Sequence, residues 1–203
     1  DVYKRQGYPV ELNLNGLKVE YAHTRPYRGM KLEDIEILHA LHEWKVEADY
    51  SSAIRLLEPF VRQLEQKEDS LANRNKYYRP LSYLKEKLLL WEIKQQVDSV
   101  NVGDSVRPYL KKDMLEGVYC DDGRRTYYWE GNQMINTLIA YRIIKNDPSL
   151  CKLKENMQLY ILRTKERGWN TYQASSAVAT VLTDLLAGSG GMSGTSVSVS
   201  GKD

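Results

Sequence analysis

The sequence predicts an all-α fold: a partial α/α toroid of antiparallel helix pairs, with an N-terminal β-hairpin before it and a truncated C-terminal strand after it. From residue 32 onward the apolar residues follow a helical period, which favours helices over strands. A phrase led by tryptophan also occurs twice, as Trp129 with Gln133 and, forty positions later, as Trp169 with Gln173. A two-helix unit that recurs at this spacing is typical of helical arrays and rings.

Size and charge limit the class of protein. The 203 residues make one large domain or one and a half small ones, and an apolar share of 42% can fill a sizeable core. The 29 basic and 27 acidic residues leave a net charge of +2. Phosphate binding needs a concentrated basic excess, so no nucleic acid partner is expected. No apolar run approaches the length of a membrane span, so none is expected here.

The two ends of the sequence differ in character from its body. Residues 1–6 resemble the translated end of a sequencing adapter. We interpret them as an adapter-derived artefact and predict no fold for them. A β-hairpin and irregular lead-in are expected over residues 7–30, and a helical toroid-like domain over residues 31–187. Residues 188–203 then read as a Gly/Ser linker and the start of a following β module. We therefore expect a piece of a longer protein.

The hairpin is predicted from alternation and turn chemistry. Residues 10–14 and 17–21 each alternate apolar and polar side chains, as strands with one buried face do. Asn15 and Gly16 between them tolerate the positive φ that a two-residue type I′ turn requires. Residues 23–30 are then irregular.

The next segments predict two amphipathic helices. Their expected core faces are Ile37, Leu41, Trp44 and Ala48 in the first, and Ala53, Leu57, Phe60 and Leu64 in the second. The opposite face of the second carries alternating charges and is expected to face water: Arg55, Glu58, Arg62 and Glu65. Pro59 lacks a backbone donor, so we expect a kink or break near Glu58. The polar residues 66–75 predict a loop or a frayed helix end.

A third helix is expected to be buried on two sides. Its first apolar stripe is Tyr77, Leu81, Leu84, Leu88 and Trp91, and its second is Leu90, Ile93 and Val97. Two stripes on one helix require two packing partners. Clusters of Gly, Pro and Asp over residues 98–125 then predict a long connection with one helical turn.

Three more helices complete the predicted domain. The fourth, residues 131–145, is apolar almost all round and is expected to be buried. The fifth begins at an Asp147 N-cap and ends at Gly168 after a basic last turn. The sixth begins at about Thr171, carries a face of small residues that lets another helix approach closely, and ends at Gly188. Two concentric layers of helices need inner helices that are buried on two sides and outer helices that are buried on one, and the predicted helices include both kinds.

The order of these elements carries a resemblance to a known family, and the specific likeness covers residues 127–186. The matching features are Trp129, the apolar helix 134–144, the helix 148–167, Trp169 and the small-residue helix 174–186. Together they resemble the helical ring of the α2-macroglobulin family, especially its large bacterial members in Bacteroidetes-like cell envelopes. The resemblance implies an α/α toroid of paired helices followed by β-sandwich modules.

The resemblance also implies a function in protease trapping. Members of this family are endopeptidase inhibitors in which a protease cuts an exposed bait segment and the molecule collapses around it. Some also form a covalent bond through an internal thioester in a Cys-Gly-Glu-Gln type motif. This chain has no such motif, since Asp-Asp-Gly follows Cys120 and Lys-Leu-Lys follows Cys151.

We therefore expect a non-catalytic helical part of an α2-macroglobulin-like endopeptidase inhibitor. By the same resemblance, its location would be the periplasm or cell envelope. Its partners would be proteases, through the full-length protein, and neighbouring β-sandwich modules of the same chain.

No residue is assigned a catalytic, cofactor-binding or metal-binding role, and no cofactor is expected. His39 and His42 share one helical face with Glu36 and Glu43 nearby, but a third metal ligand has no obvious candidate and the spacing is not HExxH. The two carboxylates that follow Cys120 raise the pKa of a thiol, which opposes a reactive thiolate. Two cysteines are also too few for a disulfide framework.

Two other functions stay open. A toroid enzyme acting on carbohydrates or isoprenoids would place carboxylates at one mouth of the ring, where Glu130 and Asp122 are the candidates. A plain helical-repeat adaptor would form an open superhelix. Trp129 and Trp169 could stack on sugars, but we expect them to pack on the first turn of the following helix. The basic turn around Arg163 is expected to offset a helix dipole.

Overall fold

The chain folds mainly into helices, as predicted. The computed structural model describes residues 9–13, 18–21, 30–126, 133–165, 168 and 171–188. The larger helices are α2 (Leu32–Glu43), α3 (Tyr50–Arg74), α4 (Leu84–Val97), α6 (Gln133–Ile144) and α7 (Cys151–Thr164). Shorter helical pieces are α5 (Gly103–Val106), η1 (Arg107–Tyr109), η2 (Pro148–Leu150), α8 (Thr171–Ala177), η4 (Val178–Leu182) and α9 (Thr183–Gly188). The strands are β1 (Pro9–Asn13), β2 (Lys18–Tyr21), β3 (Leu110–Lys112) and β4 (Val118–Cys120).

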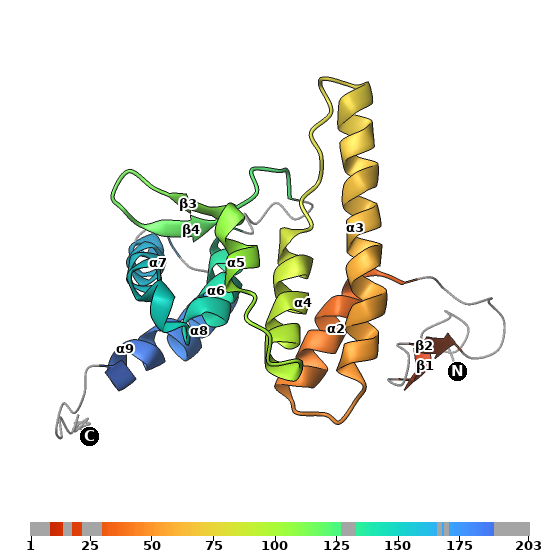
Figure 1. Cartoon of the computed structure of the whole chain (residues 1–203), viewed down its shortest axis with the longest axis horizontal. Coiled ribbons are helices and arrows are strands. Elements are labelled where there is room, and N and C mark those ends of the chain that lie inside the picture. The colour runs from red at the N-terminus through yellow and green to blue at the C-terminus, as the bar shows by residue number, and fades with distance from the viewer. Residues whose placement is uncertain are drawn as a thin grey trace, which may run out of the picture.

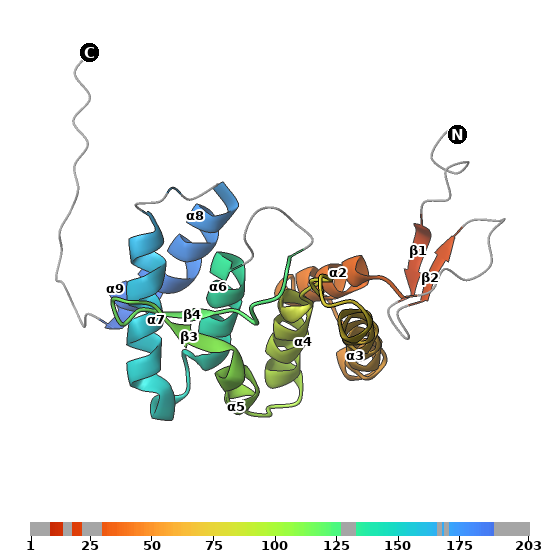
Figure 2. The same ribbon diagram turned by 90° about the horizontal axis from the view of Figure 1, so that it is seen from above.

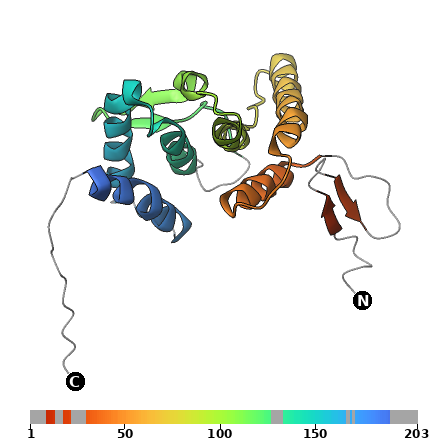
Figure 3. The same ribbon diagram turned by 60° about the horizontal axis from the view of Figure 1, so that its bottom comes forward.

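Four helices stand in a row, in the order α3, α4, α6 and α7 (Figures 1 and 2). Helix α4 packs against α2, α3 and α6, and α6 packs against α4, α7 and α8. Helices α3 and α4 are antiparallel neighbours in the row (Figure 1). Helices α2, α8 and α9 lie along one side of this row, at the bottom of Figure 3. The described part of the chain is thus a two-layered helical array.

The two central helices of the row carry most of the core. Helix α6 is buried almost all round, as its apolar sequence predicted. Helix α4 buries apolar residues on more than one side: Leu84, Leu88, Leu89, Leu90 and Ile93. The expectation of two packing partners for this helix is confirmed, although it begins at Leu84 and leaves Tyr77 81% exposed ahead of it.

The predicted core face of α2 is largely wrong, since only Ala48 of its four residues packs against the core. Ile35 and Leu38 are buried, whereas Ile37 is 42% and Trp44 76% exposed. The helix ends at Glu43 with Trp44 as its C-cap, and Lys45 then adopts a positive φ of 56°, so Ala48 lies beyond the helix and no longer shares a face with Ile37 and Leu41. The side that meets α4 is therefore chosen by tertiary packing and not by the longest apolar stripe.

Helix α3 also differs from the prediction. It runs without a break through Pro59 and includes residues 66–74, which were expected to form a loop or a frayed helix end. Pro59 and Arg55, whose carbonyl loses its helical partner, are both exposed, so water can satisfy that carbonyl. The last turns of α3 are held by Glu68, whose buried carboxylate accepts hydrogen bonds from the Tyr78 hydroxyl at 2.8 Å and from the Leu81 amide at 2.9 Å.

The charged face of α3 is divided between water and α4. Arg55 and Arg62 are exposed, as predicted. Glu58 instead pairs with Lys94 at 2.8 Å, and Glu65 pairs with Lys87 at 3.1 Å. The alternating charges therefore also join the two antiparallel helices.

The long connection between α4 and α6 contains a β-hairpin that was not predicted. Strands β3 and β4 pair antiparallel, with Lys111 opposite Tyr119, and β4 packs on α6 and α7. At the tip, Asp113 Oδ1 accepts hydrogen bonds from the amides of Leu115 and Gly117 at 2.9 and 2.7 Å. A Cβ atom at Gly117 would lie 2.1 Å from the guanidinium of Arg163, so this position favours glycine. Three-residue strands give too short an alternation to stand out from a loop.

The predicted roles of Asp147 ahead of α7 and Gly168 after it agree with the described structure. The Asp147 carboxylate accepts a hydrogen bond from the Ser149 amide at 2.9 Å, and a short 3₁₀ turn then leads into α7. Gly168 has a φ of +89° and donates its amide to Lys165, as a C-terminal stop does. The sixth helix begins at Thr171 and runs to Gly188 with a π-helical section, η4, in its middle.

The N-terminal hairpin is present, since β1 pairs antiparallel with β2 and Asn13 lies opposite Lys18. Its Asn15-Gly16 turn lies outside the described residues. So do the predicted artefact at 1–6, the strand start after residue 188, and the residues Trp129, Glu130, Arg167 and Trp169. None of the helices described is both long and apolar enough to cross a membrane.

Replacing Tyr141 with phenylalanine is expected to lower the free energy of unfolding by about 1–3 kcal/mol. The fully buried Tyr141 hydroxyl of α6 donates to Asp184 of α9 at 3.0 Å and accepts from Gln158 of α7 at 2.8 Å. Without it, the buried Gln158 amide loses this partner. Urea unfolding followed by circular dichroism measures the loss, and an unchanged midpoint would contradict the role of this contact.

Candidate functional site

The candidate site centres on the buried carboxylate of Glu92. It lies in α4, only 4% exposed, where three helices meet. Arg142 of α6 donates to both carboxylate oxygens, from Nε to Oε1 at 2.6 Å and from Nη2 to Oε2 at 2.7 Å. His39 of α2 forms a third hydrogen bond, from Nε2 to Oε2, at 2.9 Å. One carboxylate thus joins α2, α4 and α6; we call these three residues the Glu92 junction.

The surroundings of Glu92 favour its charged form. Burial alone would raise its pKa, because a carboxylate loses hydration in the interior. The hydrogen bonds and positive charge of Arg142, together with His39, outweigh burial and lower the pKa of Glu92 to about 2. The carboxylate is therefore ionised at neutral pH and paired in two directions.

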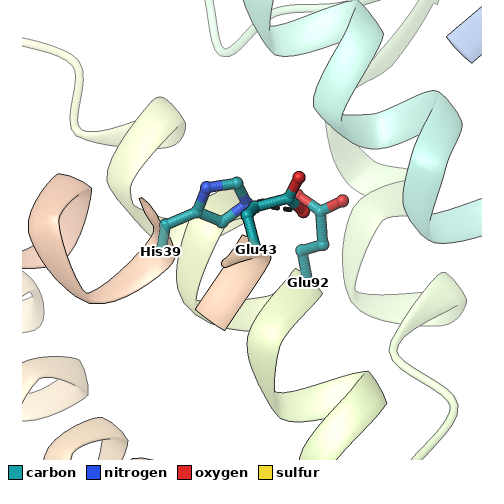
Figure 4. Close-up of side chains that lie close together, drawn as sticks. All are labelled: His39, Glu43 and Glu92. Carbon is teal, nitrogen blue, oxygen red and sulfur yellow. Dashed lines mark hydrogen bonds and ion pairs between the residues drawn. The ribbon is translucent and has the colours of Figure 1, made fainter. Parts of the chain in front are cut away.

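The sequence offers no obvious third metal ligand near His39 and Glu43, whereas the structure brings Glu92 close to both. The ligand atoms of His39, Glu43 and Glu92 lie within 4.8 Å of one another (Figure 4). Imidazole nitrogen and carboxylate oxygen are ligands that zinc accepts. The Glu92 oxygens, however, already lie in the fork of Arg142, and Glu43 Oε1 is 4.0 Å from His39 Nε2. A cation would have to displace a bidentate guanidinium, so the geometry fits an ion-pair junction better than a metal centre.

His42, the other histidine of the predicted pair, points to a different contact. Its ring meets the Tyr50 ring edge-on, with centroids 5.0 Å apart. Burial and the nearby His39 lower the pKa of His42, which favours its neutral form. The two histidines therefore have separate roles in the packing of α2.

A pocket opens beside the Glu92 junction, with a volume of ≈ 270 Å³. Its lining includes Glu43, Gln95, Arg142 and Lys145. Pockets that enclose small-molecule ligands usually exceed roughly 300 Å³ and are mostly apolar. This small, charged pocket is therefore a poor candidate for a substrate site.

Cys120 is a structural thiol, as its flanking carboxylates suggested. Its side chain is fully buried, and burial followed by the charges of Asp121 and Asp122 raises the pKa of Cys120 to about 12. A thiol in this state carries almost no nucleophilic thiolate at neutral pH. Cys151 is exposed, and both cysteines are free thiols.

The carboxylate considered for a toroid enzyme is used in a turn. Asp122 accepts a hydrogen bond from the Ser82 hydroxyl at 2.8 Å and another from the Arg124 amide at 3.0 Å. The basic turn of α7 also has a different use, since Arg163 donates to Asp113 at 2.9 Å and so holds the β3–β4 tip. Both residues stabilise the long connection.

The sequence contained a signal for the Glu92 junction that was not used. Glu92 lies between Trp91 and Ile93, which belong to the two apolar stripes of its helix, and Arg142 lies between Tyr141 and Ile143 of an otherwise apolar helix. Opposite charges on two helices that are both expected to be buried suggest a pair, because a buried charge needs a partner. Their separation of 50 residues hides the pairing until the helices are placed.

Comparison with protein-family models, with curated protein sequences and with solved structures finds no match for this chain. The grounds for a function are therefore the geometry and the residue pattern of the chain itself.

Replacing Thr137 with valine is expected to cost about 1–3 kcal/mol of unfolding free energy, because it leaves a buried amide unpaired. The fully buried Thr137 hydroxyl accepts a hydrogen bond from the Cys120 amide at 2.9 Å and so fixes β4 on α6. Faster thiol labelling of Cys120 would report the loosened strand. Thr183→Val is the control, since Thr183 is exposed and bonds only within its own helix; equal effects would contradict the prediction.

Proposed function

We propose that this chain is a non-catalytic helical scaffold, the thioester-domain-like part of an α2-macroglobulin-like endopeptidase inhibitor that traps proteases. The observation that carries the scaffold role is the Glu92 junction. Its buried charges are satisfied by one another across α2, α4 and α6. Groups that are used in this way hold helices in place and are not free for acid–base chemistry.

Other features support the same role. The only fully buried cysteine among the described residues, Cys120, has a pKa raised to about 12 and lacks the Cys-Gly-Glu-Gln setting of a thioester. The row α3–α4–α6–α7 with α2, α8 and α9 along one side is compatible with an arc of an α/α toroid. The likeness of residues 127–186 to the α2-macroglobulin ring supplies the family.

A scaffold of this kind would act by moving as one body. Buried hydrogen-bonded ion pairs allow few alternative packings, so a displacement at one helix would be passed to its neighbours. In the proposed inhibitor, the body would pack against β-sandwich modules in the periplasm or cell envelope and shift with them after bait cleavage. The proteases would meet the full-length protein and not this part alone.

The test begins with the coding sequence on both sides of this chain, which should encode β-sandwich modules. The full-length protein should then trap an added protease, which would still cleave a small peptide substrate but no longer a large protein substrate. Flanking modules of another class, or an unaffected protease, would overturn the inhibitor role. Turnover of a polysaccharide or an isoprenoid diphosphate by the purified protein would favour the toroid enzyme instead.

A further inference from the structure

The outward side of α2 carries an apolar stripe that the core does not use. Ile37, Leu41 and Trp44 follow one another at i, i+4 and i+7, and the core formed by the described residues includes none of them. Ile37 is 42% exposed, Trp44 is 76% exposed, and Leu41 is half-buried. An adjoining side of the same helix buries Ile35 and Leu38 in the core. Helix α2 is therefore apolar on two sides but packed on one.

The dimensions of the stripe match a helix as partner. Seven residues of helix extend over roughly 10 Å, or two turns, which is the length over which two packed helices interdigitate. Ala40 beside the stripe is small and allows a close approach. A row of apolar side chains at this spacing is the feature that helix-binding surfaces present.

The charge around the stripe decides what kind of helix fits. Residues 31–47 contain five acidic and two basic side chains: Glu33, Asp34, Glu36, Glu43 and Glu47 against Lys31 and Lys45. Glu36 is paired with Lys85 of α4, whereas Glu33, Glu43 and Glu47 are exposed. A second copy of α2 laid on the stripe would bring these acidic borders together, which is unfavourable.

We propose that the Ile37–Leu41–Trp44 stripe is a docking surface for an amphipathic helix of another protein segment whose apolar face is bordered by lysine and arginine. The partner's apolar side chains would cover Ile37 and Trp44, and its basic border would meet the acidic excess of residues 31–47, in which Glu33 and Glu47 are exposed. This surface is independent of the inhibitor role, since it depends only on α2 and its charges.

The test uses two synthetic three-heptad helical peptides with the same leucine face, one bordered by lysine and arginine and the other by glutamate. Fluorescence anisotropy with the full 203-residue chain should show that the basic-bordered peptide binds at least about tenfold more tightly. The double change Ile37→Ser and Trp44→Ser should weaken that binding by about tenfold or more, because it removes the apolar anchors. Unchanged thermal melting would show that the variant is folded.

The control changes two exposed apolar residues elsewhere. Met114→Ser with Leu115→Ser, at the tip of the β3–β4 hairpin, should leave binding unchanged. If the double variant of α2 does not fold, Trp44→Ser alone gives the same comparison. Equal binding of both peptides, no binding, or equal loss in the control would overturn the proposal. So would self-association of the chain that disappears on Trp44→Ser, since the occupant would then be a second copy.

Discussion

Replacing Arg142 with methionine will lower the free energy of unfolding by about 3 kcal/mol, near the lower end of the range for breaking a buried ion pair. Methionine keeps the apolar stem of the side chain and removes the charge. Glu92, whose side chain is 5% exposed, then lies in the interior with only His39 as a close partner. The lower end of the range applies because the Arg142 side chain keeps 19% of its surface exposed. Urea unfolding followed by circular dichroism measures the change.

Two further variants separate a lost ion pair from lost packing. Glu92→Leu combined with Arg142→Met removes both charges and should recover most of the stability, since an apolar pair of similar volume often replaces a buried ion pair without loss. Lys94→Ala breaks the more exposed pair with Glu58 and should cost less than about 1 kcal/mol. A double variant as unstable as Arg142→Met, or a Lys94 variant equal to it, would mean that charge at the Glu92 junction is not the cause.

Acidification should weaken the fold through the same carboxylate. The folded-state pKa of Glu92, about 2, lies below its ordinary value of 4.5, so the folded state favours the ionised form. A depressed pKa contributes stability above the unfolded value and loses it as the pH falls toward the folded value. We expect Glu92 to contribute about 3 kcal/mol at neutral pH, and this contribution to disappear between about pH 4.5 and pH 2.

Other carboxylates also titrate in this range, so the measurement must be a difference. Asp49, Asp113 and Asp147 have lowered pKa values because of hydrogen bonds that their carboxylates accept. Glu92→Gln keeps the size of the side chain and removes its charge, and with the charge its titration. The gap in unfolding free energy between the wild type and this variant should shrink as the pH falls. A gap that stays constant from neutral pH to pH 3 would contradict the assigned pKa shift.

Sequence reasoning was successful where a property is local. The apolar character of α6, the burial of α4 on more than one side, the Asp147 cap and the positive φ of Gly168 depend on residues a few positions apart, and each is confirmed, although Tyr77 and Val97 of the two predicted stripes are exposed and α7 already ends at Thr164. The direction of the Cys120 pKa was also predictable, since Asp121 and Asp122 follow it directly, although burial is the larger cause. The toroid, the inhibitor role and the envelope location remain predictions.

The errors came where a choice depends on distant parts of the chain. Pro59 was expected to kink or break α3 near Glu58, but the helix continues because Arg55 and Pro59 are exposed, so water can satisfy the carbonyl that loses its partner. The continuation to Arg74 is fixed by Glu68, which bonds to Tyr78 and Leu81 beyond the helix. The better apolar stripe of α2 was expected inside, but the body covers Ile35 and Leu38 instead. Both outcomes depend on which elements pack against the helix in the tertiary structure.

The residue pattern by itself determined that this chain is mainly helical, where most of its larger helices lie and that α4 and α6 lie in the core, because helical periodicity and capping act over one or two turns. Only the tertiary structure decided which side of α2 is covered and that His39, Glu92 and Arg142 share one site. The physical reason is that a buried charge specifies that a partner must exist but not where in the sequence it lies, and the packing of three helices supplies that partner.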